Sequence, residues 1–370
     1  MKRLYLFGNV GNLSSLPKSG GQTSARRVIK GLEDVGFEVV PIVRHRGVLE
    51  SRIGHFAEIL FFALIDLFKI ILVMIGGKRK NTAFLHLTFS GPLVPYEYVI
   101  SCVVRMMGYK SITYLQGGQF MDFYDYGSSF HKSLFKRNMQ MQELVMFEGL
   151  EGLRLVKDIC STPLAYFPGY AFDEDIPQTS PNRSADIINI CCFGRVAPGK
   201  NTLKVIEAFN ILCSERDNIR LFVVGGAGQS KNYVEQVDEA ISKSPYRNKI
   251  TRKGLSSPLY IKSLLQECHI FLFPTQERCE GHSNALTEAM TYGVVPVVSD
   301  WHFNRSIVGR DDLVVKGYDP ADYAKRIFSL IDSGELPVIS VEMIERVRNN
   351  YSCTKVNASI CNKIEKVLLD

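Results

Sequence analysis

The sequence predicts an α/β protein of two domains, each built around a parallel β-sheet. The chain has 370 residues, and a domain usually holds about 100–200. Residues 270–274 form an apolar run, followed by a polar loop, a helical repeat of apolar residues and a second apolar run at 294–298. Strand, loop, helix and strand in this order form one unit of a parallel sheet. Short apolar runs alternate with helical patterns in the same way along both halves of the chain.

The composition sets broad limits on the class of protein. Apolar residues make up 46% of the chain and charged residues 22%, values typical of globular proteins with sizeable cores. The net charge of +6 is mild, and no Lys/Arg block is long enough to indicate nucleic-acid binding. The nine cysteines include no CxxC pair, which predicts free thiols in a reducing compartment. We therefore expect a cytoplasmic protein with no nucleic acid among its partners.

The first half opens with an expected strand at 4–7 and a glycine-rich loop that ends at Gly20 and Gly21. Apolar residues at helical spacing follow as far as Gly36, and a second strand is expected at 39–43. Because glycine lets a backbone approach a ligand closely, the entrance of this helix is a candidate phosphate-binding turn.

Residues 55–75 are long and apolar, but Glu58, Asp66 and Lys69 interrupt them. Charged residues inside a membrane-spanning helix are costly, so we expect one or two helices packed on the first sheet. A peripheral contact with lipid stays open as an alternative. Its lipid-facing side would consist of Phe56, Phe61, Phe62, Phe68 and Ile71, followed by the basic residues Lys78, Arg79 and Lys80.

Strands at 82–87, 111–115 and 144–147 continue the first domain, with helices at 96–107 and 128–141. The strand at 111–115 ends at Gln116, a residue that can hydrogen-bond a hydroxyl but cannot titrate. The polar residues 178–184 then have the composition of a linker.

The second half opens with a strand at 187–193 that ends at Gly194 and Arg195, and Lys200 stands just before a helix. Arginine offers a planar fork and lysine a point charge, so these two cations suit a diphosphate. Further strands end at Gly225 and Gly254, and the second of these turns is expected to face a nucleotide base. Helices are expected at 320–331 and 356–369.

The loop after residue 274 is the most informative stretch of the chain. It carries Gly281, Ser283 and Asn284 and opens a helix, whose backbone N–H groups and dipole favour an anion. Glu280 and Glu288 flank this loop. An anion bound between two carboxylates suggests a ligand that also has hydroxyls to hold, such as a sugar nucleotide.

This stretch resembles a known family. Glu280, seven residues and then Glu288, followed by Ala289-Met290 and Gly293, resemble the E-x(7)-E motif of retaining glycosyltransferase family 4. The glycine pair at 20–21 and the segment from Gly194 to Lys200 are similar to further parts of that family, in the same order. The resemblance covers most of the chain, and its firm motifs lie within residues 187–300.

The resemblance implies the GT-B fold, with two facing Rossmann-like doubly wound domains and a cleft between them. It implies an acceptor-binding domain at 1–177, a nucleotide-sugar-binding domain at 185–350 and a final helix at 351–370 that crosses back to the first domain. The implied activity is that of a retaining hexosyltransferase, which moves a sugar from a nucleotide diphosphate to an acceptor hydroxyl. The acceptor would be a saccharide or lipid-linked saccharide of surface polysaccharide or glycolipid biosynthesis, with peripheral contact at an anionic inner membrane face.

The same resemblance assigns roles to individual residues. Glu280, Arg195 and Lys200 are expected to be catalytic. Binding of the donor or acceptor is expected from a larger set: Gly20, Gly21, Gln116, Gly194, Gly225, Gly254, Gly281, His282, Ser283, Asn284 and Glu288. The family often has a histidine where this chain has Gln116, and the departure argues against acid–base chemistry there. Neither a metal nor a cofactor is expected, because Arg195 and Lys200 can replace a cation at the diphosphate.

Two other functions are considered as alternatives. A non-hydrolysing sugar-nucleotide epimerase shares the fold, but it would need ordered acid and base groups near the sugar, and the sequence shows no such set. A catalytically silent sugar-binding subunit is the other; the retained Arg195, Lys200, Glu280 and Glu288 argue against it. The D-x-D sequence that begins at Asp173 is interpreted as solvated loop acids and not as a manganese site.

Overall fold

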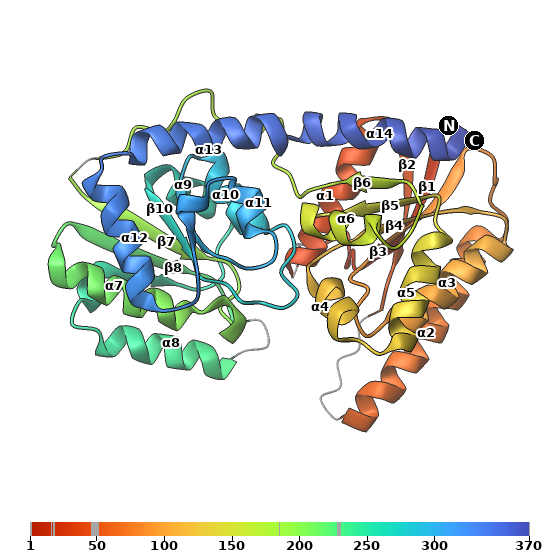
Figure 1. The fold of residues 1–370 in the computed structure, drawn as a ribbon, viewed down its shortest axis with the longest axis horizontal. Coiled ribbons are helices and arrows are strands. Elements are labelled where there is room, and N and C mark those ends of the chain that lie inside the picture. The colour runs from red at the N-terminus through yellow and green to blue at the C-terminus, as the bar shows by residue number, and fades with distance from the viewer. Residues whose placement is uncertain are drawn as a thin grey trace. The chain divides into compact units, whose positions relative to one another are not determined.

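The chain forms two compact units (Figure 1). The computed structural model describes residues 2–15, 17, 19–45, 52–184, 186–227 and 231–369, with the side chains of residues 52–57, 59 and 60 left out. The first unit comprises Met1–Pro168 and Val356–Asp370, and the second comprises Gly169–Lys355. The polar segment 178–184 therefore lies within the second unit.

The first unit is built on a six-stranded parallel sheet with the order β2-β1-β3-β4-β5-β6. The strand order reverses between β1 and β3, which is where open α/β sheets bind ligands, outside the carboxyl ends of the strands. The strands are β1 (Lys2–Gly8), β2 (Phe37–Val43), β3 (Thr82–Thr88), β4 (Lys110–Leu115), β5 (Leu144–Phe147) and β6 (Leu164–Tyr166).

Helices link and cover these strands. Helix α1 (Gly20–Asp34) begins where the Ser19 hydroxyl accepts a hydrogen bond from the N–H of Gln22 (3.3 Å), as an N-cap residue should. The other helices of the first unit are α2 (Arg52–Met74), α3 (Val94–Met106), α4 (Gln119–Tyr126), α5 (Ser129–Gln140) and α6 (Leu150–Lys157), joined by most of α14 (Cys353–Leu369).

Helix α2 is a single helix of 23 residues, which settles the choice between one helix and two. Its Ile70 and Met74 pack into a buried cluster with Phe7, Phe84 and Ile100 of the first sheet and α3. Among the residues that the structure describes, no helix is both long enough and apolar enough to cross a membrane. Phe56, one of the proposed lipid-facing residues, has its side chain outside the described set.

The second unit has its own six-stranded parallel sheet, with the order β12-β11-β10-β7-β8-β9. Counted within the unit, this is the strand order 3-2-1-4-5-6 of a dinucleotide-binding fold, with the reversal between β7 and β10. The strands are β7 (Ile188–Phe193), β8 (Ile219–Val224), β9 (Ile250–Lys253), β10 (Ile270–Phe273), β11 (Val295–Ser299) and β12 (Val314–Val315). The predicted α/β class with two Rossmann-like units is confirmed.

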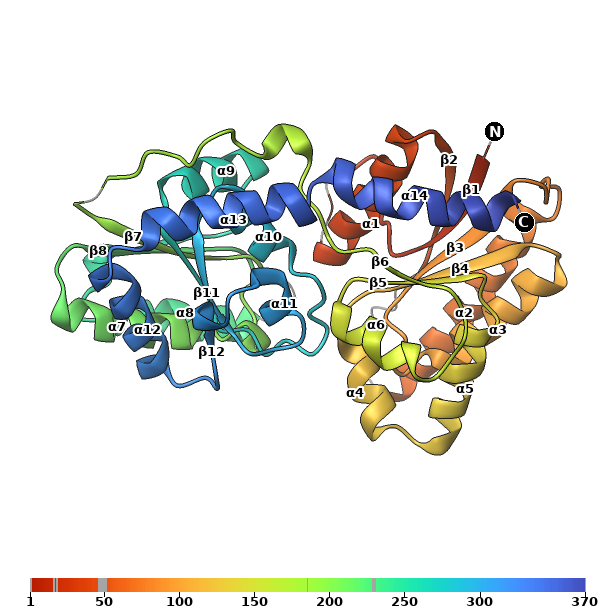
Figure 2. The ribbon, with the colours of Figure 1, turned by 45° about the horizontal axis from the view of Figure 1, so that its top comes forward.

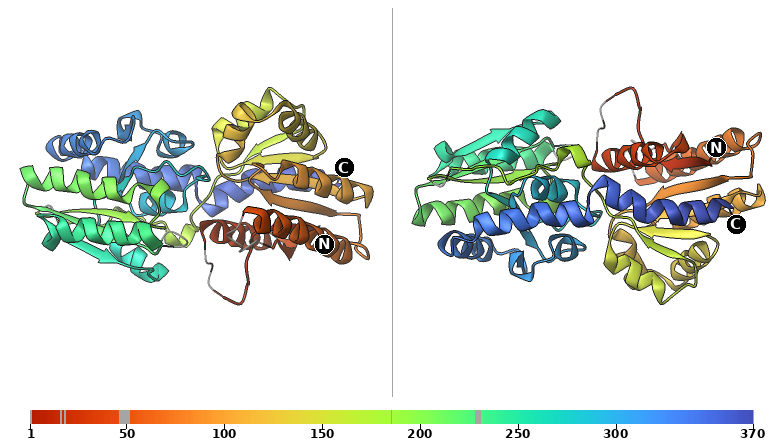
Figure 3. Two further views of the ribbon diagram at one scale, coloured as in Figure 1. Left: turned by 90° about the horizontal axis from the view of Figure 1, so that it is seen from below. Right: turned by 90° about the horizontal axis from the view of Figure 1, so that it is seen from above.

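Helices cover both faces of the second sheet. Helices α7 (Thr202–Glu215), α8 (Lys231–Lys243) and α12 (Pro320–Asp332) lie on one face, and α9 (Pro258–Glu267), α10 (Asn284–Thr291) and α13 (Leu336–Asn350) lie on the other (Figures 1 and 2). Figure 3 shows α7 and α8 side by side. The short helix α11 (Asn304–Val308) follows β11.

Candidate functional site

The reversal point of the second sheet brings together the loops that follow β7 and β10. These two strands pair directly, Ile270 with Ile190 and Phe271 with Cys191, so the loops leave the sheet side by side at its carboxyl edge. The first loop carries Arg195 and Lys200 and the second carries Glu280. Residues about 80 positions apart in sequence therefore meet here, as expected from the positions of the predicted strand ends.

Glycine is required where β7 and β8 end. Gly194 has φ +121° and Gly225 has φ +148°, a region that other residues rarely adopt. A Cβ atom on Gly225 would lie 1.7 Å from the carbonyl oxygen of Gly194, so a side chain at this position would collide with the neighbouring strand end. Backbone conformation thus accounts for Gly194, and conformation together with close packing accounts for Gly225, while their contact with a substrate stays a prediction.

Two ion pairs join the two loops. The Arg195 guanidinium contacts the Glu277 carboxylate, with Nη2 and Oε2 2.9 Å apart. The Lys200 ammonium contacts the Glu280 carboxylate in a more buried pair, whose side chains are 17% and 10% exposed. Glu280 also accepts a hydrogen bond from the Thr275 hydroxyl (3.4 Å). The structure thus brings together all three residues predicted to be catalytic and adds Glu277, which the sequence analysis missed.

Backbone hydrogen bonds fix the turn that presents Lys200. This turn is a single 3₁₀ turn, Pro198–Lys200, followed by Asn201 in the left-handed region at φ 54°. The Asn201 amide donates to the carbonyl of Pro274 (2.7 Å), and the N–H of Gln276 donates to the carbonyl of Gly199 (2.7 Å). The Lys200 ammonium also lies 4.9 Å from the centre of the Phe273 ring. The lysine therefore extends from a rigid support.

The loop from Glu280 to Ser283, here termed the donor loop because the sequence analysis predicts that it binds a donor, leads into helix α10. Ser283 caps the helix, since its hydroxyl accepts from the N–H of Leu286 (3.5 Å). His282 is 5% exposed, and its Nε2 lies 2.7 Å from the Thr287 hydroxyl. Gly281 and Asn284 are half-buried beside these residues. The helix N-terminus therefore lies next to the Lys200–Glu280 pair, as the expected anion site requires.

Trp301 and His302 support the backbone of Glu277 and Glu280. The indole N–H of Trp301 donates to the carbonyl of Glu277 (2.9 Å), and its ring stacks on His302, with ring centres 4.4 Å apart. His302 in turn contacts the carbonyl of Glu280 through Nδ1 (3.0 Å). The two aromatic residues after β11 therefore fix the backbone at Glu277 and at Glu280, the two acids of the ion pairs. The hydrogen bond from Trp301 to Glu277 could not be predicted, because no sequence pattern links a single tryptophan after one strand to the loop after another.

Glu288 lies in the second turn of α10 and is half-buried. It lies near Tyr292, whose pKa is raised by burial and by the charges of Asp175 and Glu288. Asp175 contacts the Lys262 ammonium (3.2 Å), and this hydrogen bond raises the pKa of Lys262. Glu288 therefore belongs to a polar group of α9, α10 and the Asp175 turn.

The acids of the D-x-D sequence have structural partners and are not merely solvated. The Asp173 carboxylate accepts from the N–H of Thr354 (2.9 Å) and from its hydroxyl (3.0 Å). Asp175 is paired with Lys262. Among the described residues, no group of three or more His, Cys, Asp or Glu is arranged to hold a metal ion.

The first-unit residues form a separate group at the carboxyl edge of the first sheet. Gly20 and Gly21 open α1, and Gln116 follows β4 with 5% exposure. The Gln116 amide donates to the Ser24 hydroxyl (3.2 Å), which lies 3.5 Å from the Glu148 carboxylate. Glu148 also accepts from the N–H of Gly117 (2.9 Å). Glu148 is a buried acid that the sequence analysis missed, because one glutamate after a strand is an ordinary occurrence.

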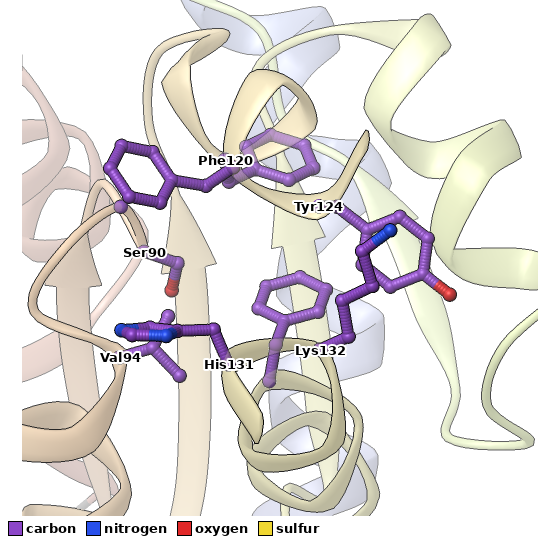
Figure 4. A pocket seen from close by; sticks show the side chains of 9 residues that line it. Ser90, Val94, Phe120, Tyr124, His131 and Lys132 are labelled. Carbon is purple, nitrogen blue, oxygen red and sulfur yellow. The ribbon is translucent and has the colours of Figure 1, made fainter. Parts of the chain in front are cut away.

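A pocket in the first unit was also not predicted. It lies between α3, α4 and α5, and Figure 4 shows His131 beside Val94 and Lys132 next to Tyr124. Aromatic rings make up much of its wall, and Ser90, His131 and Lys132 supply polar groups. Gly254, in contrast, is exposed at the end of the edge strand β9, away from the paired loops of β7 and β10.

Part of the second unit is similar in sequence to known proteins. Residues 174–349, within the second unit, match the family model described as glycosyl transferases group 1. The chain is 27% identical over 160 residues to the capsular polysaccharide biosynthesis glycosyltransferase CapM of Staphylococcus aureus, which covers 43% of this chain and 36% of that protein. The chain thus matches about a third of the length of this curated relative.

Solved structures extend the likeness over both units. Sucrose-phosphate synthase from Thermosynechococcus elongatus has a TM-score of 0.75 at 13% identity, over 98% of both chains. Trehalose-6-phosphate synthase from Burkholderia multivorans has a TM-score of 0.73 at 12% identity, over 99% of both chains. TarM of S. aureus has a TM-score of 0.64 at 13% identity, over 81% of this chain and 59% of that one.

At these identities the structural likeness shows the fold alone, and that fold is GT-B. The similarity in sequence to the group 1 glycosyl transferases is confined to residues 174–349 of the second unit.

Proposed function

We propose that this protein is a retaining glycosyltransferase, which moves a sugar from a nucleotide diphosphate to an acceptor hydroxyl in surface polysaccharide or glycolipid biosynthesis. The observation that carries the proposal is the pair of cations, Arg195 and Lys200, held beside Glu280 at the reversal point of the second sheet. A diphosphate needs such cations, and a sugar needs an acceptor such as a carboxylate for its hydroxyls. The G117R mutant of S. aureus TarM, which has the same fold, was solved with fondaparinux, α-GlcNAc-glycerol and UDP.

The chemistry follows from charge. As the bond between the anomeric carbon and the phosphate oxygen breaks, negative charge develops on the leaving diphosphate. Arg195 and Lys200 stabilise that charge in place of a metal ion. The acceptor oxygen attacks the anomeric carbon on the face that the phosphate leaves, and its proton passes to the departing phosphate oxygen. Glu280 orients the sugar through its hydroxyls.

The alternative is a double displacement with Glu280 as nucleophile, as in retaining glycosidases. In the structure the Glu280 carboxylate is bound by Lys200 and Thr275, which suits positioning better than attack. Mass spectrometry of the native enzyme and of Glu280→Gln with a slow donor distinguishes the two routes. A glycosyl ester on native Glu280 would establish double displacement.

The acceptor is proposed to bind the first unit. The resemblance supports this assignment; the aromatic pocket of α4 and α5 does not, because its volume of about 10 Å³ has room for about one water molecule and not for a sugar ring. A lipid-linked acceptor would bring this unit to a membrane, and we propose peripheral contact at the anionic inner face through α2.

The test is a screen of nucleotide sugars by thermal shift, since a ligand that binds only the folded state raises the melting temperature. The donor that stabilises most is then incubated with candidate acceptors, and the anomeric configuration of the product is read by NMR. We expect transfer with retention. Epimerised donor formed without any acceptor would instead support the epimerase, and binding without turnover would support a silent subunit.

A further inference from the structure

The side chain of His282 connects the donor loop to both places where the chain passes from one unit to the other. Its ring makes an edge contact with Tyr351, with ring centres 4.9 Å apart and planes at 72°. It also lies against Gly169, where an added Cβ would be 2.8 Å from the His282 Cδ2 atom. Gly169 is the first residue of the second unit, and Tyr351 lies shortly before its last residue, Lys355.

The two passing segments are joined to each other. The N–H of Ala171 donates to the carbonyl of Tyr351 (2.9 Å), and the N–H of Cys353 donates to the carbonyl of Ala171 (2.8 Å). Asp173 then caps the start of α14 by accepting from the backbone and the hydroxyl of Thr354. Residues 169–173 and 351–354, here termed the crossover segments, therefore form one hydrogen-bonded group.

The orientation of the His282 ring is set by Thr287, one turn into α10. The Nε2–Oγ1 distance is 2.7 Å, and both side chains are buried, at 5% and 1% exposure. The backbone of His282 lies between Glu280 and Ser283, the residues nearest the proposed sugar and phosphate. A shift of this loop therefore moves a buried ring that has no free space on its Gly169 side.

We propose that His282 is a positioning residue, which transmits occupation of the donor loop to the crossover segments. The proposal rests on the proposed function in one respect, namely that a nucleoside diphosphate occupies the site. The physical reason is that close-packed groups change between discrete arrangements and do not deform continuously. A ligand that favours one arrangement of the loop then favours the matching arrangement of Gly169 and Tyr351.

Hydrogen exchange measured by mass spectrometry, with UDP and GDP as probes, tests this on the full chain. In the native protein, a saturating nucleotide should slow exchange both in residues 280–288 and in the crossover segments. Thr287→Val removes the hydroxyl that orients His282 and keeps the side-chain shape. In Thr287→Val, the nucleotide should still slow exchange in residues 280–288 but should no longer slow most of the exchange in the crossover segments. In Thr287→Ser, which keeps the hydroxyl, the nucleotide should again slow exchange in the crossover segments.

Activity gives a second readout. In Thr287→Val, turnover at saturating donor should fall about fivefold or more, in the range of measured coupling between sites, with donor affinity nearly unchanged. His269→Gln is the matched control, because His269 lies at the opposite edge of the second sheet, against Asn189 and Ser184. It should behave as the native protein does.

The outcomes separate the two proposals. Protection of 280–288 without protection of the crossover segments in the native protein would overturn the inference and leave the proposed function standing. Equal crossover protection in the native protein and Thr287→Val would also overturn it. No protection anywhere with any nucleotide would overturn both.

Discussion

Lys200 and Arg195 are each held by a carboxylate, so a diphosphate that reaches them must share or replace Glu280 and Glu277. The pairs keep the two cations in place before any substrate binds. Lys200 is the more constrained of the two, because it is more buried and its supporting turn is bonded to the β10 exit. The largest effect on chemistry is therefore expected from Lys200.

Replacing Lys200 by Met should lower turnover about 10²–10³-fold, the usual loss when a donor to a developing oxyanion is removed. The measurement is the steady-state rate at saturating donor. Lys243→Met is the control, since Lys243 is 74% exposed on α8 and contacts Glu239 four residues away. A Lys200→Met enzyme within tenfold of the native rate would remove Lys200 from the mechanism.

Transfer is predicted to be independent of metal ions. With Arg195 and Lys200 serving as the cations, a chelator should leave the rate of transfer unchanged. Loss of activity in chelator and recovery with manganese would contradict this prediction and indicate that a metal ion binds at the donor.

Glu288→Ala should weaken binding of the free nucleoside diphosphate by about 1–3 kcal/mol, the range for a lost hydrogen bond to a charged group. We predict that this carboxylate binds the donor ribose, and calorimetry with UDP or GDP measures the effect. Glu239→Ala on exposed α8 serves as the control. Unchanged affinity in Glu288→Ala would mean that this acid serves the neighbouring Tyr292 and Lys262 group instead.

Among the elements, α2 has an unusual distribution of residues. Its polar Asp66 is 2% exposed and faces inward, where it binds His45 Nδ1 (2.6 Å) and the Tyr96 hydroxyl (3.2 Å). Its outward residues are large and apolar, at least 55% exposed, at helical spacing: Phe61, Leu64, Phe68 and Leu72, with Ile75 just beyond the helix. The exposed Lys78 and Lys80 follow. An apolar exposed face with basic residues at its end is typical of a helix that lies on an anionic bilayer.

The double variant Leu64→Glu/Phe68→Glu should therefore reduce binding to vesicles that contain anionic lipid, measured by flotation. The native protein should bind such vesicles better than neutral ones, and high salt should release part of it. Leu259→Glu is the control, because Leu259 is a single exposed apolar residue on α9 of the second unit. Native protein that floats with neither type of vesicle would contradict the membrane contact.

Much of the architecture could be predicted because β-strands and glycine turns leave strong local signals. The runs that became β7, β10 and β11 were placed within a residue or two, and the strand ends located Arg195, Lys200 and Glu280. Helices α8 and α13 were not predicted. Among the described residues of α8, Val237 alone is fully buried, and α13 mixes β-branched residues into its apolar face, so the helical period is faint.

The partners of these residues could not be predicted in the same way. Glu277 meets Arg195 across 82 positions of sequence, and only the order of strands in the folded sheet makes them neighbours. The same holds for the ring of His282 between Gly169 and Tyr351. Contacts of this kind depend on the register of whole elements, which a local pattern does not contain.

At the scale of the whole molecule, the stability of the first unit should depend on pH through His86. This residue of β3 is 1% exposed among Phe7 and Phe84, and neither ring nitrogen has a hydrogen-bond partner. Burial, with a smaller effect of the Arg44 charge, lowers its pKa from 6.5 to about 3. Between these values the unfolded state binds a proton that the folded state does not. The free energy of unfolding should therefore fall by about 1.4 kcal/mol for each pH unit below 6.5.

The test compares the native protein with His86→Leu at pH 7.5 and pH 5.5, by hydrogen exchange of amides in β1, β3 and β4. The variant should gain stability relative to the native protein by roughly 1.4 kcal/mol on going to the lower pH. His131→Gln, a change at a partly exposed histidine of α5, should show no such gain. A difference between native protein and His86→Leu that does not change with pH would contradict the assignment.

The membership of α14 in the first unit has a consequence for biosynthesis. Its Val356, Ile360 and Ile364 are buried, and Lys110 donates to the carbonyl of Val367 (2.7 Å). The ribosome releases these residues only after all of Gly169–Lys355, a continuous segment, has been made. The first unit therefore lacks part of its core throughout the synthesis of the second, with the surface that α14 covers left exposed. Incomplete domains expose apolar surface to chaperones, so a purified chain that lacks residues 356–370 should be more sensitive to protease in the first unit than in the second.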